Sequence, residues 1–88
     1  MSYTLIFHQL ALEEIQDAHD WYEQQRTGLG VEFMDAIDEV MQHILSNPKS
    51  HPVAHQQRRR ALPARFPYLV IFEQHGDVIL VEIGRAHV

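Results

Sequence analysis

The stretch RRRALPARFPYLVIF (residues 58–72) decides the predicted fold, because it contains the most apolar run of the sequence. YLVIF (68–72) is apolar at every position, which is typical of a central strand covered on both faces. RRRAL (58–62) can form a neighbouring strand with its arginines partly outward, and Pro63 breaks or bulges it because proline cannot donate to a ladder. Four of the seven basic residues lie between Arg58 and Arg65. The arginines therefore gather beside the strand that anchors the predicted sheet.

Two more strands are predicted outside this stretch. VILVEI (78–83) follows the turn QHGD (74–77), where Gly76 can take the positive φ that hairpin turns need. YTLIFH (3–8) mixes β-branched, aromatic and aliphatic residues, which indicates a first strand. PKSHPVAHQQ (48–57) has the composition of a loop.

The sequence between the first strand and residue 48 has the period of two amphipathic helices. The first helix, expected over residues 9–26, ends at RTGLG (26–30), because Gly28 can take the left-handed conformation found at helix ends. The second ends at Asn47-Pro48, because proline cannot continue a helix. So short a connection predicts an antiparallel helical hairpin. The apolar stripes are Ala11, Ile15, Ala18 and Tyr22 in the first helix and Phe33, Ile37, Val40 and Ile44 in the second.

These elements predict an α+β fold in the order β-α-α-β-β-β. Neither helix can bury its stripe alone, and one face of the sheet needs a cover. We therefore expect the helical hairpin to pack on one face of a small antiparallel sheet. With 88 residues, the chain should form a single domain, 1–88.

The composition excludes several classes of protein. The chain has no cysteine, so it is neither a disulfide scaffold nor a thiolate zinc protein. His51 and His55 have the spacing of a helical metal site, but they lie in a proline-containing loop without a third ligand, so no metal or cofactor is predicted. No apolar run approaches the roughly 18–20 residues of a membrane span, and the N-terminus lacks the basic region of a secretory signal. We expect a cytoplasmic protein with no membrane partner.

The charge is unevenly distributed along the chain, whose net charge is −5. Residues 1–48 hold nine acids and one base, whereas residues 49–88 hold six bases and three acids. The acidic half should repel nucleic acid, and the basic half could attract nucleic acid or an acidic peptide.

Four stretches spread over nearly the whole chain point to one family. They are ALEEIQDAHDWYEQQRTGLGVEF (11–33), ILSNP (44–48), RRALPARFPYLVIF (59–72) and DVILVEIG (77–84). In their order and spacing the chain resembles the ParE/RelE superfamily of bacterial toxins from type II toxin–antitoxin systems, often labelled plasmid stabilisation proteins. The resemblance implies a helical hairpin on an antiparallel sheet and an antitoxin whose C-terminal segment wraps the toxin. The superfamily divides by activity, since RelE-like members cleave mRNA in the ribosome, ParE-like members poison DNA gyrase, and other members have no demonstrated target.

A RelE-like activity would need a nuclease site. Metal-free RNA cleavage requires a base for the 2′-hydroxyl, an acid for the leaving oxygen and cations for the phosphorane. The resemblance implies Arg58, Arg60, Arg65 and Arg85 as cations, with Tyr68 and His87 as candidates for proton transfer. However, Leu69 stands where RelE-like nucleases usually carry an arginine, and the chain stops at Val88, before the segment that carries further catalytic residues.

The resemblance also implies a surface that binds the antitoxin or the target, made of Trp21, Arg58, Arg59, Arg60, Arg65 and Arg85. The forked donors of arginine suit carboxylate and phosphate alike, so the residue type does not choose the partner. Taken without the resemblance, arginines on an edge strand would be explained as a guard against edge-to-edge pairing. Glu13, Asp17 and Asp20 on the first helix are interpreted as solvated surface.

We therefore predict a type II toxin of the ParE-like kind, neutralised by a cognate antitoxin and acting on DNA gyrase or another protein. Leu69, the expected C-terminus and the net negative charge argue against a nuclease. Two alternatives remain open. One is a RelE-like ribosome-dependent mRNA endoribonuclease, with ribosome and mRNA as partners. The other is an inactive module that only binds its antitoxin.

Overall fold

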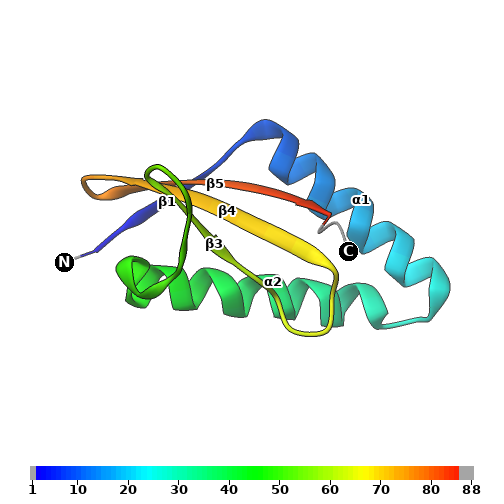
Figure 1. The fold of residues 1–88 in the computed structure, drawn as a ribbon. Helices are drawn as coiled ribbons and strands as arrows, with labels where there is room; N and C mark the ends of the chain where they lie inside the picture. Colours follow the sequence, from blue (N-terminus) through cyan, green and yellow to red (C-terminus); the bar gives the residue numbers. More distant parts are fainter. Residues whose placement is uncertain (1, 86–88) are drawn as a thin grey trace.

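The computed structural model describes residues 2–85, which form one sheet with two helices packed on it (Figure 1). The predicted α+β class and the order of a first strand, two helices and a strand meander are confirmed. Neither helix has the length and apolar character needed to cross a membrane. The elements are β1 (Thr4–Phe7), α1 (Gln9–Gln25), α2 (Leu29–Ser46), the 3-10 helix η1 (Pro48–Ser50), β2 (Val53–His55), β3 (Arg58–Ala61), β4 (Tyr68–His75) and β5 (Val78–Arg85).

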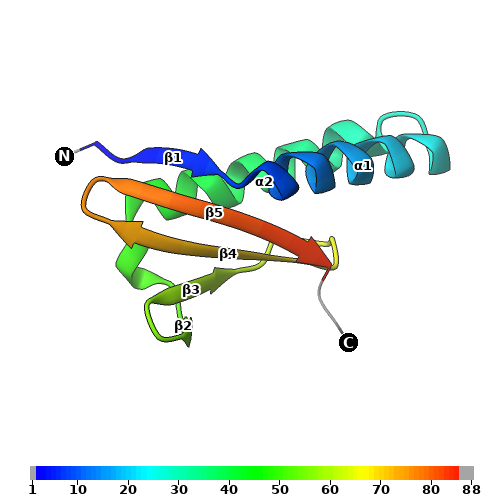
Figure 2. The ribbon, with the colours of Figure 1, turned by 90° about the horizontal axis from the view of Figure 1, so that it is seen from above.

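The sheet is mixed, with the strand order β1-β5-β4-β3-β2 seen in Figure 2. β3, β4 and β5 pair antiparallel, as predicted. The other edge differs from the expected wholly antiparallel sheet, because β1 pairs parallel with β5, with Thr4 opposite Val78 and Phe7 opposite Val81. Side-chain alternation identifies a strand but carries no information on the direction of its neighbour.

The segment expected to be a loop contains a short additional strand. β2 pairs with β3 in an irregular register, with Val53 opposite Arg59 and His55 opposite Arg58. The Arg60 N–H also donates to the Pro52 carbonyl at 3.0 Å. β2 provides partners for backbone groups on the outer edge of β3. Three residues are too few for an alternating pattern to show in the sequence.

Both helices cover the same face of the sheet, and the core lies between them and that face. The stripe residues Ala11, Ile15, Ala18, Phe33, Ile37, Val40 and Ile44 are all buried, together with Val70, Phe72, Ile79 and Val81 of the sheet. Leu69 and Ile71 lie on the opposite, uncovered face and are only partly buried. YLVIF therefore forms a central strand as predicted, but the helices cover only one of its two faces.

An aromatic cluster of Tyr22, Phe33, Phe66 and Tyr68 ties the helices to the start of β4. Phe33 has no exposed surface, and its ring centroid lies 5.3–5.4 Å from those of the other three residues. The rings of Tyr22 and Phe66 meet edge to face at 4.9 Å. This packing fixes the position of Tyr68, one of the candidate site residues.

The turn between the helices is held by the Glu23 carboxylate. It accepts hydrogen bonds from the backbone N–H groups of Gly28 and Gly30, each at 3.0 Å. These N–H groups lie at the N-terminus of α2, where the helix itself provides no partner for them. These bonds lower the pKa of Glu23. Gly28 has φ +91°, so it takes the left-handed conformation predicted for the turn.

Candidate functional site

The three arginines of β3 point to opposite faces of the sheet. Arg59 lies opposite Phe72 on the helix-covered face, and its guanidinium donates to the His51 carbonyl at 2.7 Å. Arg58 and Arg60 lie on the uncovered face, where Arg58 pairs with the Glu82 carboxylate of β5. Arg60 is exposed and makes no ion pair with any residue from 2 to 85.

Arg65 belongs to a separate ion-pair group. It lies in the connection from β3 to β4 with φ +71°, and its guanidinium contacts the Glu32 carboxylate of α2 at 2.9 Å. Arg26 contacts the same carboxylate at 2.7 Å. These two arginines, Arg26 more strongly, lower the pKa of Glu32. Arg65 thus connects a loop to α2, and its guanidinium also lies 5.4 Å from the centre of the Phe66 ring.

Trp21, Tyr68 and Arg85 come together at another place. Arg85 ends β5 directly opposite Tyr68, and the two residues line an open hollow of about 370 Å³ with Trp21, Tyr22 and Pro67. We call it the aromatic hollow. Trp21 is half exposed and meets Tyr22 edge to face at 5.1 Å, whereas Tyr68 is only 3% exposed.

The electrostatics of the aromatic hollow are set by burial and by Arg85. Burial raises the pKa of the Tyr22 hydroxyl, the neighbouring Tyr68 raises it further, and Arg85 opposes the rise.

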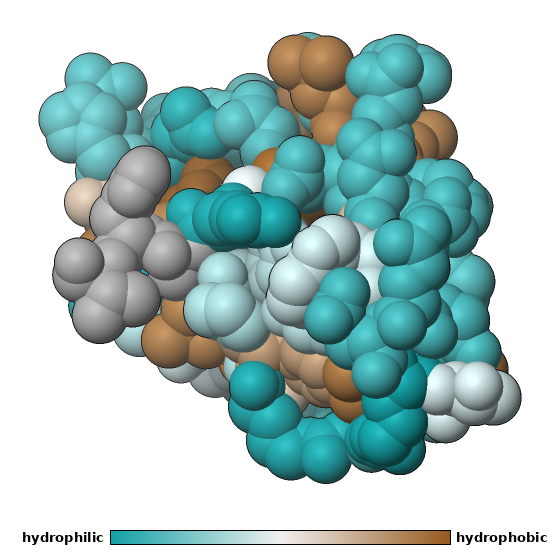
Figure 3. All heavy atoms as spheres, turned by 90° about the vertical axis from the view of Figure 1, so that its right-hand side faces the viewer, coloured by the Kyte–Doolittle hydropathy of each residue, from teal (hydrophilic) through white to brown (hydrophobic). Residues whose placement is uncertain are grey.

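Hydrophilic side chains predominate on the end of the molecule shown in Figure 3, and hydrophobic atoms appear there only in separate small areas. This end of the molecule therefore offers no broad apolar surface.

The structure therefore does not bring the candidate nuclease residues into one cluster. Arg58 and Arg60 lie on the uncovered face of the sheet, Arg65 is paired with α2, and Tyr68 and Arg85 lie at the aromatic hollow. His87, the other candidate for proton transfer, lies outside the described residues. Of the predicted binding residues, Trp21 and Arg85 share a hollow.

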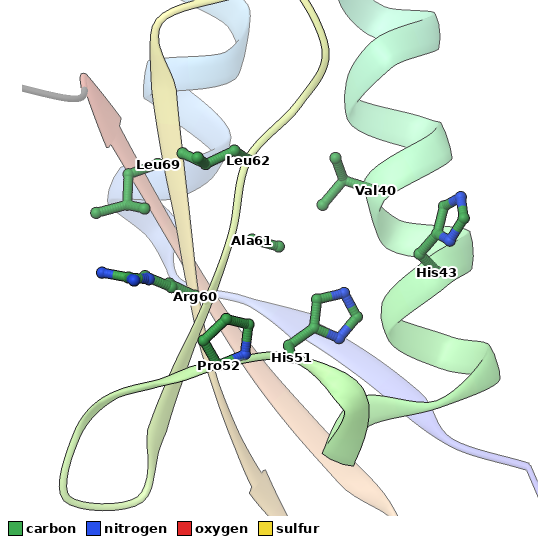
Figure 4. Close-up of a pocket in the computed structure, with 8 residues that line it drawn as sticks. All are labelled: Val40, His43, His51, Pro52, Arg60, Ala61, Leu62 and Leu69. Carbon is green, nitrogen blue, oxygen red and sulfur yellow. The ribbon is translucent and has the colours of Figure 1, made fainter.

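A second hollow was missed by the sequence analysis. It is an open groove of about 650 Å³ between the edge of the sheet and α2, which we call the β3–α2 groove. In Figure 4, Val40 and His43 of α2 lie across from Ala61, and the His51 ring lies between them at one end, whereas Leu62 points away from α2 toward Leu69. Pro52, Arg60 and Leu69 complete the lining. The sequence contains one signal for this groove, which is Leu62, an apolar residue directly after an arginine-rich edge strand.

His51 connects the β3–α2 groove to the core. Its ring packs edge to face on Phe72, with 5.3 Å between the ring centroids. Its Nδ1 atom is buried and has no hydrogen-bond partner within residues 2–85. A buried polar atom without a hydrogen-bond partner is uncommon in folded proteins.

Comparison with known proteins gives a family and a fold. A family model described as "ParE toxin of type II toxin-antitoxin system, parDE" matches residues 5–87. No curated protein matches the chain. The chain is similar to a solved structure described as "Chromosomal ParDE TA system from P. aeruginosa", with a TM-score of 0.81 and 17% identity over 97% of both chains. At that identity the structural likeness shows the fold alone.

Proposed function

Because the chain belongs to the ParE toxin family of type II toxin–antitoxin systems, we propose that a cognate ParD antitoxin holds it inactive. Released from the antitoxin, it acts in the cytoplasm on DNA gyrase or another protein and not on mRNA.

The separation of the candidate nuclease residues supports a protein target. Cleavage of RNA without a metal requires an acid, a base and cations around a single phosphate. Arg58 and Arg65 are each paired with a carboxylate, and Arg60 lies on the face of the sheet opposite Tyr68. Assembling these groups around one phosphate would require the sheet to rearrange.

One observation favours an mRNA endoribonuclease as the second candidate. The aromatic hollow places the half-exposed Trp21 beside Arg85 and Tyr68. An exposed aromatic ring can stack on an unpaired base, and arginine can contact a phosphate. A nuclease built here would use Arg85 and Tyr68 without the arginines of β3.

The test is to induce the chain without its antitoxin in a bacterial host and to follow growth and transcript integrity together. Growth arrest with intact transcripts, and inhibition of supercoiling by the purified chain in a gyrase assay, would support the proposal. New cuts in translated messages, mapped by primer extension and abolished by Arg85→Ala, would overturn it in favour of the nuclease. Arg60→Ala is the matched control, because Arg60 lies on the opposite face of the sheet. Unimpaired growth would favour the remaining alternative, an inactive module that only binds its antitoxin.

A further inference from the structure

A third hollow lies at the end of the sheet opposite the aromatic hollow. It is open and has a volume of about 350 Å³. We call it the polar hollow, and its lining consists of Lys49, Val53, Gln56, Gln57, Arg59, Gln74 and Gly76. We propose that the polar hollow is an anion-binding site that takes a small phosphate ligand, either inorganic phosphate or a phosphate monoester. Such a site goes beyond the proposed function and does not depend on the target of the toxin.

Two turns and η1 build the polar hollow. The β2–β3 turn and the β4–β5 turn meet at one end of the sheet, because β3 pairs antiparallel with β4. Figure 2 shows both turns at the end of the sheet away from the C-terminal end of β5. η1 brings Lys49 to the same place. Gln74 of the polar hollow and Tyr68 of the aromatic hollow lie on β4 about 20 Å apart along the strand, so the two hollows are separate sites.

Arg59 is the strongest argument for an anion. Its side chain is partly buried, and the structure gives its guanidinium one partner, the neutral carbonyl of His51 at 2.7 Å. Arg59 makes no ion pair with any residue from 2 to 85. A neutral acceptor offsets only part of the cost of removing a guanidinium from water, so an anion would stabilise this side chain. The bond to His51 also holds the guanidinium in place and leaves its other donors available.

Lys49 adds a second cation to the polar hollow. It is the only lysine of the chain, it is exposed, and it makes no ion pair within the described residues. The lining contains no carboxylate. Glu73 is next to Gln74 in the sequence, but it lies on the uncovered face of the sheet, where it contacts His75 at 3.3 Å. Two cations without an acid between them create a local positive potential in a chain whose net charge is −5.

The remaining lining suits a phosphate group better than an apolar ligand. Gln56, Gln57 and Gln74 carry amide N–H groups that can donate to an anion. One N–H of Gln74 already donates to the Gly76 carbonyl at 3.1 Å, which holds this amide at the rim. A terminal phosphate has three or more oxygens and up to about two negative charges at pH 7. It therefore matches two cations and several N–H donors more completely than a carboxylate, which has a single charge.

Charge also distinguishes a small phosphate ligand from a nucleic acid. The backbone of DNA presents the same chemical group, but it is a long polyanion, and this chain has nine acids within residues 1–48. Those acids would repel a polyanion, whereas a small ligand can enter the polar hollow without approaching the helices. We therefore assign the polar hollow to a small phosphate ligand.

A titration of the purified chain with inorganic phosphate, followed by NMR at constant ionic strength, tests the assignment. The backbone N–H signal of Gly76 and the side-chain amide signals of Gln56 and Gln57 should shift and reach saturation. Acetate and chloride at the same ionic strength should give no saturable shift, because a single charge engages fewer of the donors. A ¹³C-methyl label on Lys49 provides an independent signal, since no other side chain of this chain is a lysine.

Three variants separate a defined site from a general effect of charge. Lys49→Gln should raise the Kd for phosphate about fivefold or more, because it removes a charged donor from the polar hollow. Arg60→Gln is the matched control, since it removes one positive charge from an exposed residue on the opposite face of the sheet, and it should change Kd by less than about twofold. Arg59→Lys keeps the charge but loses the forked donor geometry, so it should also weaken binding. Lys49→Gln is exposed and keeps the test valid if Arg59→Lys fails to fold.

Each outcome decides the assignment. A saturable shift that Lys49→Gln weakens and Arg60→Gln does not would support it. The assignment would be overturned if phosphate gave no saturable shift, if acetate bound equally well, or if the two glutamine variants weakened binding equally. It would also be overturned if a short DNA duplex shifted the same signals and bound more tightly than phosphate, because the occupant would then be a nucleic-acid backbone. Failure of the chain to inhibit gyrase would refute the proposed function without affecting this titration.

Discussion

Replacing Phe33 by alanine should remove a large part of the folding free energy. Phe33 is fully buried and has three ring neighbours at 5.3–5.4 Å. Truncation of a buried phenylalanine costs about 3–5 kcal/mol, depending on how far the surroundings collapse. Because the three neighbours come from α1, the β3–β4 connection and β4, they cannot all move inward, and we expect about 4 kcal/mol. A domain of this size has roughly 4–13 kcal/mol in total.

Urea unfolding followed by circular dichroism measures this loss. With a slope of about 1–2 kcal/mol per molar urea for a small domain, the midpoint should fall by about 2–4 M. Val31→Ala is the control, because Val31 lies on the same helix but is 58% exposed, and we expect a change within about 0.5 kcal/mol.

Phe33→Leu gives an intermediate result and guards against complete unfolding of the alanine variant. Leucine keeps much of the apolar volume, so the expected loss is about 1–2 kcal/mol. The reasoning would be refuted if Phe33→Ala lowered the urea midpoint no more than Val31→Ala does. The aromatic cluster would then not be the rigid packing that positions Tyr68.

Two further predictions concern the turn between the helices. The pKa values of Glu23 and Glu32 are lowered from the ordinary value of 4.5 in the folded chain, so their contribution to stability is complete above pH 4.5 and is lost as the pH falls below it. The urea midpoint should therefore drop between pH 5 and pH 3, and by less in Glu32→Gln. An equal drop in that variant would contradict the assignment. Gly28→Ala should lower stability by about 1–2 kcal/mol, because alanine is strained at φ +91°. Gly84→Ala should be nearly neutral, because a methyl group added there meets no atom within 4 Å and the φ of Gly84 is not positive. Thermal unfolding gives the order of stability of the two variants, which would be reversed if strain were unimportant.

The helices and the central strand could be predicted because their signals are local. Phe33, Ile37, Val40 and Ile44 recur at helical spacing, and all four are buried against the sheet. Asn47 caps α2 directly before Pro48, where the predicted helix ended. In both cases the signal lies within a short segment of the chain. The helix is indicated by the spacing of its apolar residues, and its end is indicated by a proline that lacks an N–H.

The candidate site could be predicted only in part. Arg58, Arg59 and Arg60 are adjacent in the sequence, but strand alternation and ion pairing direct them to different surroundings. Trp21 and Arg85 are 64 positions apart, and they line the same hollow because α1 packs against β5. The family resemblance identified both as candidates, without indicating which other residues would join them.

The sequence by itself determined β1, the two helices, the strands β3, β4 and β5, their order, the helical hairpin and the face that each helix buries. It also carried the motifs that indicate the ParE family. The tertiary structure alone decided that β1 lies parallel to β5, that β2 covers part of β3, and that α2 and β3 enclose a groove. The physical reason is that periodicity and turn chemistry act between residues close in the chain. The neighbours of a strand and the lining of a groove depend instead on non-local packing, in which many distant residues contribute small energies together.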